Sequence, residues 1–320
     1  MNLRVIFYGF GSIAKQHIKI LKSINSNFRF HVIRKKSDCI SKDDKITFYR
    51  SIKDIKKINL IKLGFVCSPF NFHFKHSLEL IKNKINIFVE KPFLQNSKEL
   101  KNLLFQSKKK KILIQTGFLL RLNPAIKKIK NIIKNNKYGK VINIESNFTS
   151  YLPNWRTNDY SKSVSAQKKY GGGVINELVH EVDYLNLIFG KLKCINKNLI
   201  RSSDLKTNVE ERAFIFLKTK NNIPVFLKLS LNEKILSRYL FINFSKGSLF
   251  WDLIKNDIVL RKLRNKKFLI KKIKIKNTMQ SLKKIQIKKF LSNVSNKKYG
   301  IFSFDQEEKT IKTLNEIKKK

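Results

Sequence analysis

The sequence predicts two domains: an N-terminal α/β domain with a parallel sheet, and an α+β C-terminal domain with a largely antiparallel sheet. Over roughly the first 120 residues, short apolar runs alternate with helical periods, which is typical of βαβ units with right-handed crossovers. After Asn123-Pro124 the rhythm changes. From Leu192 to Ile275, apolar stretches are separated by turn signals with few helices between them. We therefore expect one domain over residues 1–121 and a second over residues 122–320.

In the first domain, the short apolar runs are the expected strands and the longer amphipathic stretches are the expected helices. We expect strands at Arg4–Tyr8, Phe30–Ile33, Ile61–Cys67, Ile85–Val89 and Ile112–Gln115, and helices at Ser12–Leu21, Asn71–Ile81 and Lys98–Phe105.

The second domain is expected to open with a helix and a strand, followed by a long loop and a glycine run at 171–173. A helix follows the glycines, antiparallel strands fill residues 192–275, and two helices close the chain. The expected bounds are Ala125–Ile133 (helix), Val141–Phe148 (strand), Tyr151–Tyr170 (loop), Val174–Phe189 (helix), Ser281–Leu291 and Asp305–Ile317 (closing helices).

The composition is that of a globular protein with an extreme positive charge. Of the 320 residues, 42% are hydrophobic, and 69 Lys and Arg face 22 Asp and Glu, for a formal charge of +47. Such a charge invites a nucleic-acid partner. However, Lys is spread along the whole chain, and abundant Lys, Asn, Ile and Phe indicate AT-rich codons. We expect no nucleic-acid binding, but the charge favours an anionic substrate through long-range steering.

Compartment signals point to the cytoplasm. The three cysteines, Cys39, Cys67 and Cys194, form no CxxC pair, and their odd number argues against a disulfide framework. The N-terminus lacks a signal-peptide pattern, and no window is long and apolar enough to span a membrane. We expect a cytoplasmic protein with no membrane association and no metal site.

A glycine motif follows the first expected strand. Gly9-Phe10-Gly11-Ser12-Ile13-Ala14 reads G-x-G-x-x-A between a strand and a helix, the context that a dinucleotide-binding Rossmann turn requires. Gly9 permits the tight turn, Gly11 admits the pyrophosphate, and Ala14 lets the helix pack closely on the strand. The amino end of the helix offers unpaired N–H groups to the phosphates. The alternative is an ordinary strand–turn–helix glycine pair.

The end of the second strand favours NADP over NAD. Where an acid normally holds the ribose 2′-hydroxyl of NAD, this chain has Arg34 and Lys35, which could hold a 2′-phosphate. The alternative is that the loop is basic only because the chain is rich in Lys.

Two further segments carry candidate chemistry. Glu90-Lys91-Pro92 ends a buried strand, the position where open α/β sheets bind ligands. Asn176, His180 and Asp183 are spaced i, i+4 and i+7, so they share one face of the expected helix. Alone, the lysine could be a solvated strand end and the histidine a core residue. Together with the glycine run, the polar stripe indicates a functional site.

At this point the sequence resembles the glucose–fructose oxidoreductase and inositol dehydrogenase family, written Gfo/Idh/MocA, over most of its length. The segment Gly9 to His17 is similar to its opening fingerprint, and Glu90-Lys91-Pro92 to its lysine motif. Further similarities are Cys67 to His73 (T/S-P-x-x-x-H), Gly117 to Pro124 with Arg121 (the crossover into the second domain), and Gly171 to Asp183 (G-G…D…H-x-x-D).

The resemblance implies an NAD(P)-dependent dehydrogenase acting on CH–OH groups. Lys91 would orient the substrate hydroxyl, and His180 would be the general base as hydride leaves for the nicotinamide. The peptide before Pro92 is often cis in the family. It also implies cofactor contacts from Gly9, Gly11, Ser12, Ile13, Ala14, Arg34, Lys35, Ser68, Pro69, His73, Glu90 and Lys91.

This chain departs from the family pattern at one position. The family often has an Asp four residues before the histidine, where this chain has Asn176, which cannot take a proton. Glu177 lies i, i+3 from His180 and is the neighbouring acid available to replace it. The departure puts a Lys–Asp–His proton relay in doubt and leaves Lys91 and His180 in place.

The long loop is similar to a subgroup linked to surface-sugar biosynthesis. Trp155 offers a flat face to a sugar ring, and Arg156 offers a fork to a carboxylate or phosphate. The alternative is a loop pinned by its own aromatic residues. The expected substrate residues are Arg121, Trp155, Arg156, Asn176, Glu177 and Asp183.

Three functions remain in competition: a sugar dehydrogenase, a Rossmann protein that binds a ligand without turnover, and a nucleic-acid binder supported by charge alone. In the resembling family, the antiparallel sheets of the second domain commonly pack face to face. We therefore expect a homodimer or homotetramer. The resemblance also implies a sugar-type small-molecule substrate.

Overall fold

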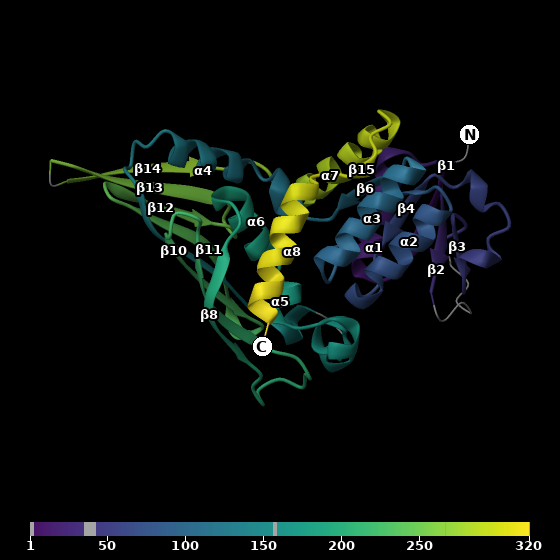
Figure 1. Cartoon of the computed structure of the whole chain (residues 1–320), viewed down its shortest axis with the longest axis horizontal. Helices are drawn as coiled ribbons and strands as arrows, with labels where there is room; N and C mark the ends of the chain where they lie inside the picture. Colours follow the sequence, from purple (N-terminus) through teal and green to yellow (C-terminus); the bar gives the residue numbers. More distant parts are fainter. Residues whose placement is uncertain (1–2, 35–42, 156–158, 266, 320) are drawn as a thin grey trace. The chain divides into compact units, whose positions relative to one another are not determined.

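The computed structural model describes residues 3–34, 43–155, 159–265 and 267–319, so the predicted contacts of Lys35 and Arg156 lie outside the described residues. The chain divides into two compact units (Figure 1). Unit 1 comprises residues 1–118 and 280–307, and unit 2 comprises residues 119–279 and 308–320.

Unit 1 is built on a parallel sheet of seven strands, in the order β15-β6-β5-β4-β1-β2-β3. The parallel α/β fold predicted for this domain is confirmed. The strands are β1 (Leu3–Tyr8), β2 (Phe28–Ile33), β3 (Ile46–Tyr49), β4 (Leu63–Val66), β5 (Asn86–Val89), β6 (Leu113–Thr116) and β15 (Gly300–Ile301). Strand β3 was not expected, because a four-residue strand in a chain rich in isoleucine gives little periodic signal.

Helices cover both faces of this sheet. They are α1 (Ser12–Ile24), α2 (His73–Lys82), α3 (Ser97–Lys110) and α7 (Met279–Ser295). On one face, α1 and α7 share a core with Val5 and Phe7 of β1, where the rings of Phe7 and Phe65 stack at 4.8 Å. On the other face, a Cβ at Gly64 would lie 2.9 Å from Leu80 of α2, so this strand needs its glycine to admit the helix.

The two compact units differ from the predicted domains in one segment. The chain leaves unit 1 after Phe118, close to the predicted boundary at 121/122. Residues 280–307, which the prediction places in the second domain, cluster with unit 1. Ile287 and Phe290 of α7 are fully buried in the core of unit 1. A helical period shows which face is apolar but not which sheet that face covers.

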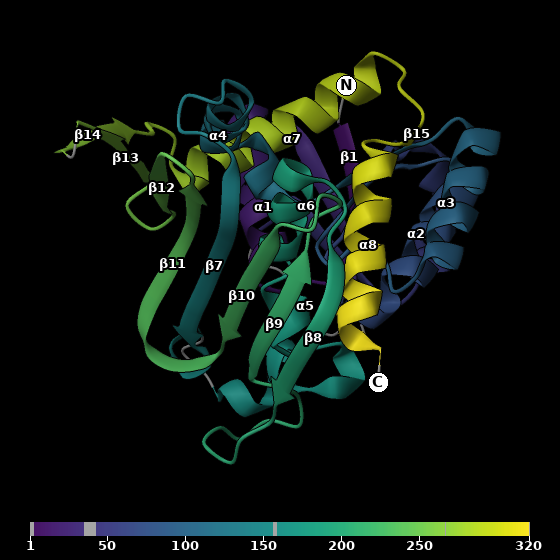
Figure 2. The same cartoon turned by 60° about the vertical axis from the view of Figure 1, so that its left-hand side comes forward.

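Unit 2 contains an eight-stranded sheet in the order β14-β13-β12-β11-β7-β10-β9-β8, seen in Figure 2. Within this sheet, β10 and β7 are the one pair of described strands that run in parallel, so the largely antiparallel prediction is confirmed. The strands are β7 (Val141–Tyr151), β8 (Lys193–Ile200), β9 (Arg212–Lys218), β10 (Pro224–Ser230), β11 (Asn232–Phe244), β12 (Gly247–Asp252), β13 (Asp257–Arg264) and β14 (Lys267–Lys274).

The helices of unit 2 gather on one face of its sheet. They are α4 (Pro124–Lys134), α5 (Val174–Glu177), α6 (His180–Phe189) and α8 (Phe304–Lys318), the last of which begins in unit 1. Tyr184 of α6 fixes this packing, because its hydroxyl meets Ser146 Oγ of β7 at 2.7 Å and its ring meets Trp251 of β12 edge-on. The opposite face carries exposed aromatic residues, including Phe214 and Phe226.

Two predicted elements of unit 2 differ from the structure. The expected helix Val174–Phe189 is broken at Leu178 and Val179 into α5 and α6. The Glu181 N–H there donates to the Leu178 carbonyl, a tighter turn than an α-helix makes. The expected loop contains short 3₁₀ helices at Leu152–Trp155, Tyr160–Lys162, Val164–Ala166 and Lys168–Tyr170. In the described part of the chain, no helix is long and apolar enough to cross a bilayer.

Candidate functional site

The candidate residues of unit 1 gather at one edge of its sheet. The glycine turn follows β1, Ser68 follows β4, Glu90 follows β5 and Arg34 follows β2. These four strands are consecutive neighbours in the sheet and run in parallel. Their carboxyl ends therefore meet at the same edge, where open α/β sheets bind ligands.

The glycine turn is shaped for a close backbone approach. Gly9 has φ of +91°, and a Cβ there would lie 2.7 Å from the Cys67 carbonyl oxygen, so no other residue fits. A Cβ at Gly11 would meet nothing within 4 Å, which leaves open space beside the backbone. Helix α1 begins at Ser12 with no side-chain cap and no acid in its first turn. The backbone N–H groups of the first turn of α1 therefore have no side-chain acceptor, and together with the helix dipole they fit a pyrophosphate.

Arg34 lies in a cluster of aromatic and basic side chains beside this turn. Its guanidinium is 5.5 Å from the ring centroid of Phe48, which meets Phe10 edge-on at 5.0 Å. Lys15 of α1 lies 5.3 Å from the centre of the Phe10 ring. A hollow of about 320 Å³ opens nearby, lined by Phe10, Lys15, Ile18, Lys19, Lys22, Asp43 and Ile46.

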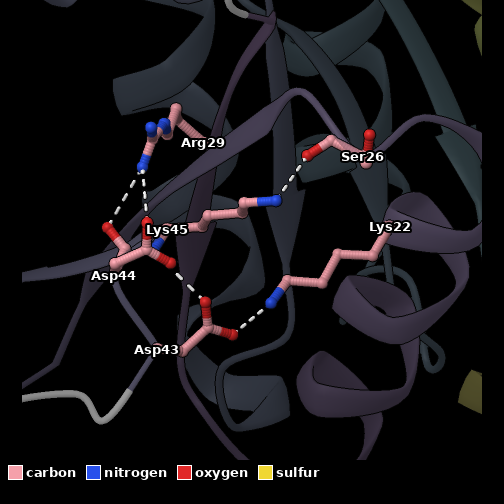
Figure 3. Close-up of polar contacts among 6 residues, drawn as sticks. All are labelled: Lys22, Ser26, Arg29, Asp43, Asp44 and Lys45. Atoms are coloured by element: carbon pink, nitrogen blue, oxygen red, sulfur yellow. Dashed lines mark hydrogen bonds and ion pairs between the residues drawn. The ribbon is translucent and has the colours of Figure 1, made fainter.

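The described acids closest to this cluster in sequence are already paired with cations (Figure 3). Asp43 accepts from Lys22 of α1, and Asp44 is 3.4 Å from the Arg29 guanidinium. Lys45 donates to the Ser26 carbonyl oxygen at 3.0 Å, which joins this turn to the end of α1. The described contacts thus engage these acids with cations other than Arg34, and the cation set is compatible with a phosphate.

The turn after β4 is fixed by one buried and one half-buried histidine. His73 lies with Nδ1 2.8 Å from the Pro92 carbonyl oxygen and Nε2 2.9 Å from that of Ser68. His76 Nδ1 pairs with Ser68 Oγ at 2.8 Å, and its ring stacks on Tyr8 at 4.1 Å. Burial lowers the pKa of His76 to about 4, so this ring is neutral at neutral pH. The contacts join the Ser68-Pro69 turn to the segment that follows Lys91.

Glu90 is a largely buried carboxylate held by a third histidine, His17. His17 Nε2 of α1 lies 2.7 Å from Glu90 Oε1, and the Lys91 N–H donates to Oε2 at 3.2 Å. Burial raises the pKa of Glu90, but the hydrogen bond and charge of His17 and the charge of Lys91 outweigh it and hold the pKa below its ordinary value. The Lys91–Pro92 peptide is cis.

In unit 2, two glycines of the run, Gly172 and Gly173, leave no space for side chains. A Cβ at Gly172 would lie 2.5 Å from the Ser165 carbonyl oxygen. Gly173 has φ of +106°, and a Cβ there would lie 2.4 Å from Glu210 Oε1. The Val174 N–H donates to the Glu210 carbonyl oxygen at 2.9 Å. Glu210 therefore fixes the start of α5, and the glycines admit it.

Asn176 is turned toward the glycine run. Its Nδ2 donates to the Gly171 carbonyl oxygen at 3.0 Å, and its Oδ1 accepts from Lys318 Nζ of α8 at 2.5 Å. Burial lowers the pKa of Lys318 to about 8, against the opposing effect of Glu210. Glu177 and His180, on either side of the helix break, are both half-buried.

Asp183 and Arg121, two of the predicted substrate residues, form an ion pair with each other. Asp183 is 1% exposed, and its Oδ2 and Oδ1 accept from Arg121 Nε and Nη2 at 2.9 and 2.6 Å. Thr310 of α8 adds a hydrogen bond to Oδ1 at 2.9 Å. Trp155 is half-buried, and its Nε1 donates to Ser150 Oγ at 3.1 Å.

Sequence reasoning missed Glu210 and Lys318. Neither belongs to a spaced motif, and in a chain with 69 Lys and Arg one more lysine near the C-terminus carries no signal. The glycine run was the only available sign that something bulky lies against it.

Models of known families match both units. Residues 3–118 match the oxidoreductase family with an NAD-binding Rossmann fold, and residues 126–250 match the GFO/IDH/MocA C-terminal domain. The chain belongs to this family. Membership accounts for the glycine turn, the cis Lys91–Pro92 peptide and the two-sheet architecture together, and it confirms the resemblance drawn from the motifs.

The curated relatives in the family are distant. The chain is 26% identical over 196 residues to myo-inositol 2-dehydrogenase of Thermotoga maritima, a match covering 59% of this chain and 55% of that protein. It is 24% identical over 157 residues to oxidoreductase P35 of Formosa agariphila, covering 46% of each. The match thus spans about half the length of these relatives.

Solved structures share the fold over nearly the full chain. A 3-ketoreductase from Actinomadura kijaniata, in complex with NADP and TDP-benzene, has a TM-score of 0.81 at 13% identity, covering 99% of this chain and 97% of that one. Levoglucosan dehydrogenase in complex with NADH has a TM-score of 0.81 at 15% identity, covering 99% and 96%. UDP-N-acetylglucosamine 3-dehydrogenase from Acidithiobacillus ferrooxidans has a TM-score of 0.76 at 12% identity, covering 99% and 97%. At these identities the similarity shows the fold alone.

Proposed function

We propose that this protein is an NAD(P)-dependent oxidoreductase that transfers hydride between the nicotinamide and a hydroxyl or keto carbon of a sugar, nucleotide sugar or sugar acid. The observation that carries the proposal is the glycine turn, with open space at Gly11 and an uncapped helix start at Ser12 in a chain of this family. The substrate class is supported by the sugar and inositol enzymes among its relatives and structural neighbours.

Lys91 and His180 are the residues proposed for the chemistry. The bound cofactor would supply the hydride acceptor or donor at its nicotinamide. Lys91 lies just after β5 in unit 1 and precedes the cis peptide to Pro92. It would hold the substrate hydroxyl by donating a hydrogen bond to its oxygen. His180, at the start of α6 in unit 2, would take the hydroxyl proton, a role suited to the ordinary pKa range of a histidine.

The remaining candidates divide between binding and support. Trp155 and Glu177, both half-buried, are proposed to contact the sugar. The mutual contacts of Arg121 and Asp183 support a role in anchoring α6 in place of the predicted substrate contact. We likewise propose that Asn176 supports the glycine run, because both ends of its amide contact protein groups.

Cofactor preference, compartment and pathway complete the proposal. Arg34 and Lys15 favour NADP, because two cations near the adenosine end of a Rossmann turn suit a 2′-phosphate. The cysteine pattern favours the cytoplasm. The resemblance of the long loop favours surface-sugar biosynthesis.

One observation favours a second candidate function, a ligand-binding protein without turnover. The position four residues before His180 is an amide, not an acid, and its amide contacts Gly171 and Lys318. Such a protein would bind the dinucleotide and leave it unreduced.

Fluorescence titration with NADPH and NADH tests the first step. We expect both to bind, with NADPH tighter. Arg34→Ala should weaken NADPH about tenfold and NADH little, because it removes one charge-assisted contact to phosphate. Lys53→Ala, an exposed lysine of the same unit, is the matched control. A folded protein that binds neither dinucleotide would refute the proposed function.

Turnover separates the two candidates. NADP⁺ or NAD⁺ reduction is followed with myo-inositol, levoglucosan and UDP-N-acetylglucosamine, each tested separately. Reduction with any of them supports the oxidoreductase, whereas dinucleotide binding without reduction across the panel favours the binding protein.

A further inference from the structure

We infer that His17 and Glu90 form a positioning pair that fixes the backbone at Lys91 and ties it to helix α1, which begins at the glycine turn. The inference rests on the proposed function and deepens it. Glu90, expected from the family resemblance to contact the cofactor, is assigned a supporting role, and His17 gains a role that sequence spacing gives no reason to expect.

The pair is buried and short. The side chains of His17 and Glu90 are 2% and 12% exposed, and Nε2 lies 2.7 Å from Oε1. A carboxylate taken out of water is costly unless it is hydrogen-bonded, so removing its partner leaves a strong penalty. The lowered pKa of Glu90 means that the carboxylate stays ionised in spite of this burial. The contact is therefore a strong constraint on both side chains.

The orientation of the histidine has one polar determinant. Its ring lies against Phe65 and Phe88, with centroids at 5.4 and 5.3 Å. Its Nδ1 is buried and meets no hydrogen-bond partner among the described residues. Aromatic packing places the ring, and Glu90 alone engages its nitrogens within the described part of the chain. The hydrogen bonding of the His17 imidazole is thus directed to the Glu90 carboxylate.

The second carboxylate oxygen of Glu90 contacts the backbone of Lys91. Glu90 Oε2 accepts from the backbone N–H of Lys91 at 3.2 Å, so the side chain of one residue holds the peptide of the next. The Glu90 N–H donates to the Val66 carbonyl at 3.0 Å, which anchors the preceding peptide, between Val89 and Glu90, to β4. Lys91 therefore leaves the strand from a backbone held on both sides.

The neighbouring strand leaves room for this carboxylate. Gly117 follows β6, and a Cβ at this position would lie 2.9 Å from Glu90 Oε2. Its own N–H donates to the Val89 carbonyl at 2.8 Å, so its backbone cannot move away without losing a sheet contact. The glycine is explained by the space that Glu90 takes.

The pair also connects two parts of the proposed site. His17 lies on α1, whose first turn begins at Ser12 beside Gly11. A ligand that orders this helix would, through His17, order the peptide of Lys91. This connection predicts that dinucleotide binding protects the Lys91 amide from exchange.

Hydrogen exchange of the segment 86–94, read by mass spectrometry with and without NADPH, tests the pair without any substrate. His17→Leu removes the donor and keeps an apolar side chain in the core. We expect exchange at the Lys91 amide to rise about tenfold, which corresponds to the loss of one ordinary hydrogen bond, and the NADPH-dependent protection to disappear. Glu90→Gln should act in the same direction.

His17→Gln is the conservative rescue, because its amide nitrogen reaches about as far as Nε2 and can still donate. It should restore most of the protection. Asp54→Asn is the matched control: its carboxylate also accepts from a backbone N–H, that of Ser51 at 2.8 Å, but it follows the edge strand β3, with β4, β1 and β2 between that strand and β5. It should leave exchange at 86–94 unchanged.

Kinetics provide the functional readout wherever the wild type turns over. His17→Leu and Glu90→Gln should lower kcat about tenfold or more while the Kd for NADPH changes less than about threefold, since the pair acts on an interaction made at the reacting centre. The double variant should lose no more than the worse single one.

The outcomes separate the two proposals. Failure of the wild type to bind either dinucleotide refutes the proposed function, whatever the exchange data show. Wild-type exchange at 86–94 in both His17→Leu and Glu90→Gln refutes the positioning pair, even where NADPH binds. Increased exchange that His17→Gln fails to reverse also refutes it, because the effect would then come from packing and not from the hydrogen bond.

Discussion

Arg121 and Asp183 form a buried ion pair inside unit 2, with the guanidinium Nη2 2.6 Å from Oδ1 and Nε 2.9 Å from Oδ2. The arginine follows the point where the chain leaves unit 1, and the aspartate lies on α6, three residues after His180. The pair therefore ties the segment that enters unit 2 to the helix that carries the proposed base.

Asp183→Asn should destabilise the protein by about 3 kcal/mol, because it leaves a largely buried arginine without its counter-charge. Chemical denaturation measures the change. Asp44→Asn is the matched control: its pair with Arg29 is exposed, at 80% and 43%, and should contribute less than about 1 kcal/mol. Equal effects from the two variants would contradict the anchoring role.

Lys91→Ala and His180→Asn should each abolish most turnover and leave NADPH binding within about threefold of the wild type. A missing general base typically costs about a hundredfold or more in kcat. Steady-state kinetics and fluorescence titration together make the measurement, with Lys98→Ala as an exposed-lysine control in unit 1. Unchanged kcat in either variant removes that residue from the proposed chemistry.

Much of this arrangement could be read from the sequence, for identifiable reasons. The glycine turn and Glu90-Lys91-Pro92 are local patterns next to strands, so their place at the carboxyl edge follows from strand order alone. The partner of a buried charge is not local. Asp183 was expected to face the substrate because of its helical spacing, and nothing in a period of 3.6 residues shows that Arg121, 62 positions earlier, occupies it.

The same limit explains why the sequence pattern shows neither the return of residues 280–307 to unit 1 nor the break in the helix. Ile287 and Phe290 have the spacing of an amphipathic helix, which would suit either sheet. The tight turn at Leu178 has no glycine or proline to mark it. It arises where α5 is held by Glu210 and α6 by Arg121 and Tyr184, which are contacts made by the folded chain.

Lys318 should make stability depend on alkaline pH. Burial lowers its pKa to about 8 in the folded state, below the ordinary lysine value, so the unfolded chain binds its proton more tightly. The free energy of unfolding should therefore rise between about pH 8 and pH 10.5 by a contribution that Lys318→Met lacks. Comparing urea denaturation of the two proteins at pH 7.5 and pH 9.5 isolates this residue from the other lysines. A constant difference between them across this range would contradict it.

The aromatic face of the sheet in unit 2 carries the last prediction. Phe214 and Phe226 are 43% and 50% exposed, and Phe226 packs against Phe216 at 5.0 Å, so this face presents an apolar patch on the side away from the helices. Exposed patches of this kind mark association surfaces, and we expect two copies of the chain to bury it in a homodimer or homotetramer.

Light scattering should give a multiple of 37.7 kDa for the wild type. Phe226→Glu should shift it toward the monomer, because a buried carboxylate on each copy would have no partner. Lys220→Glu, a charge change at an exposed turn of the same unit, is the control that should leave the mass unchanged. A wild-type monomer would contradict the expected self-association, whereas an oligomer insensitive to Phe226→Glu would place the interface elsewhere.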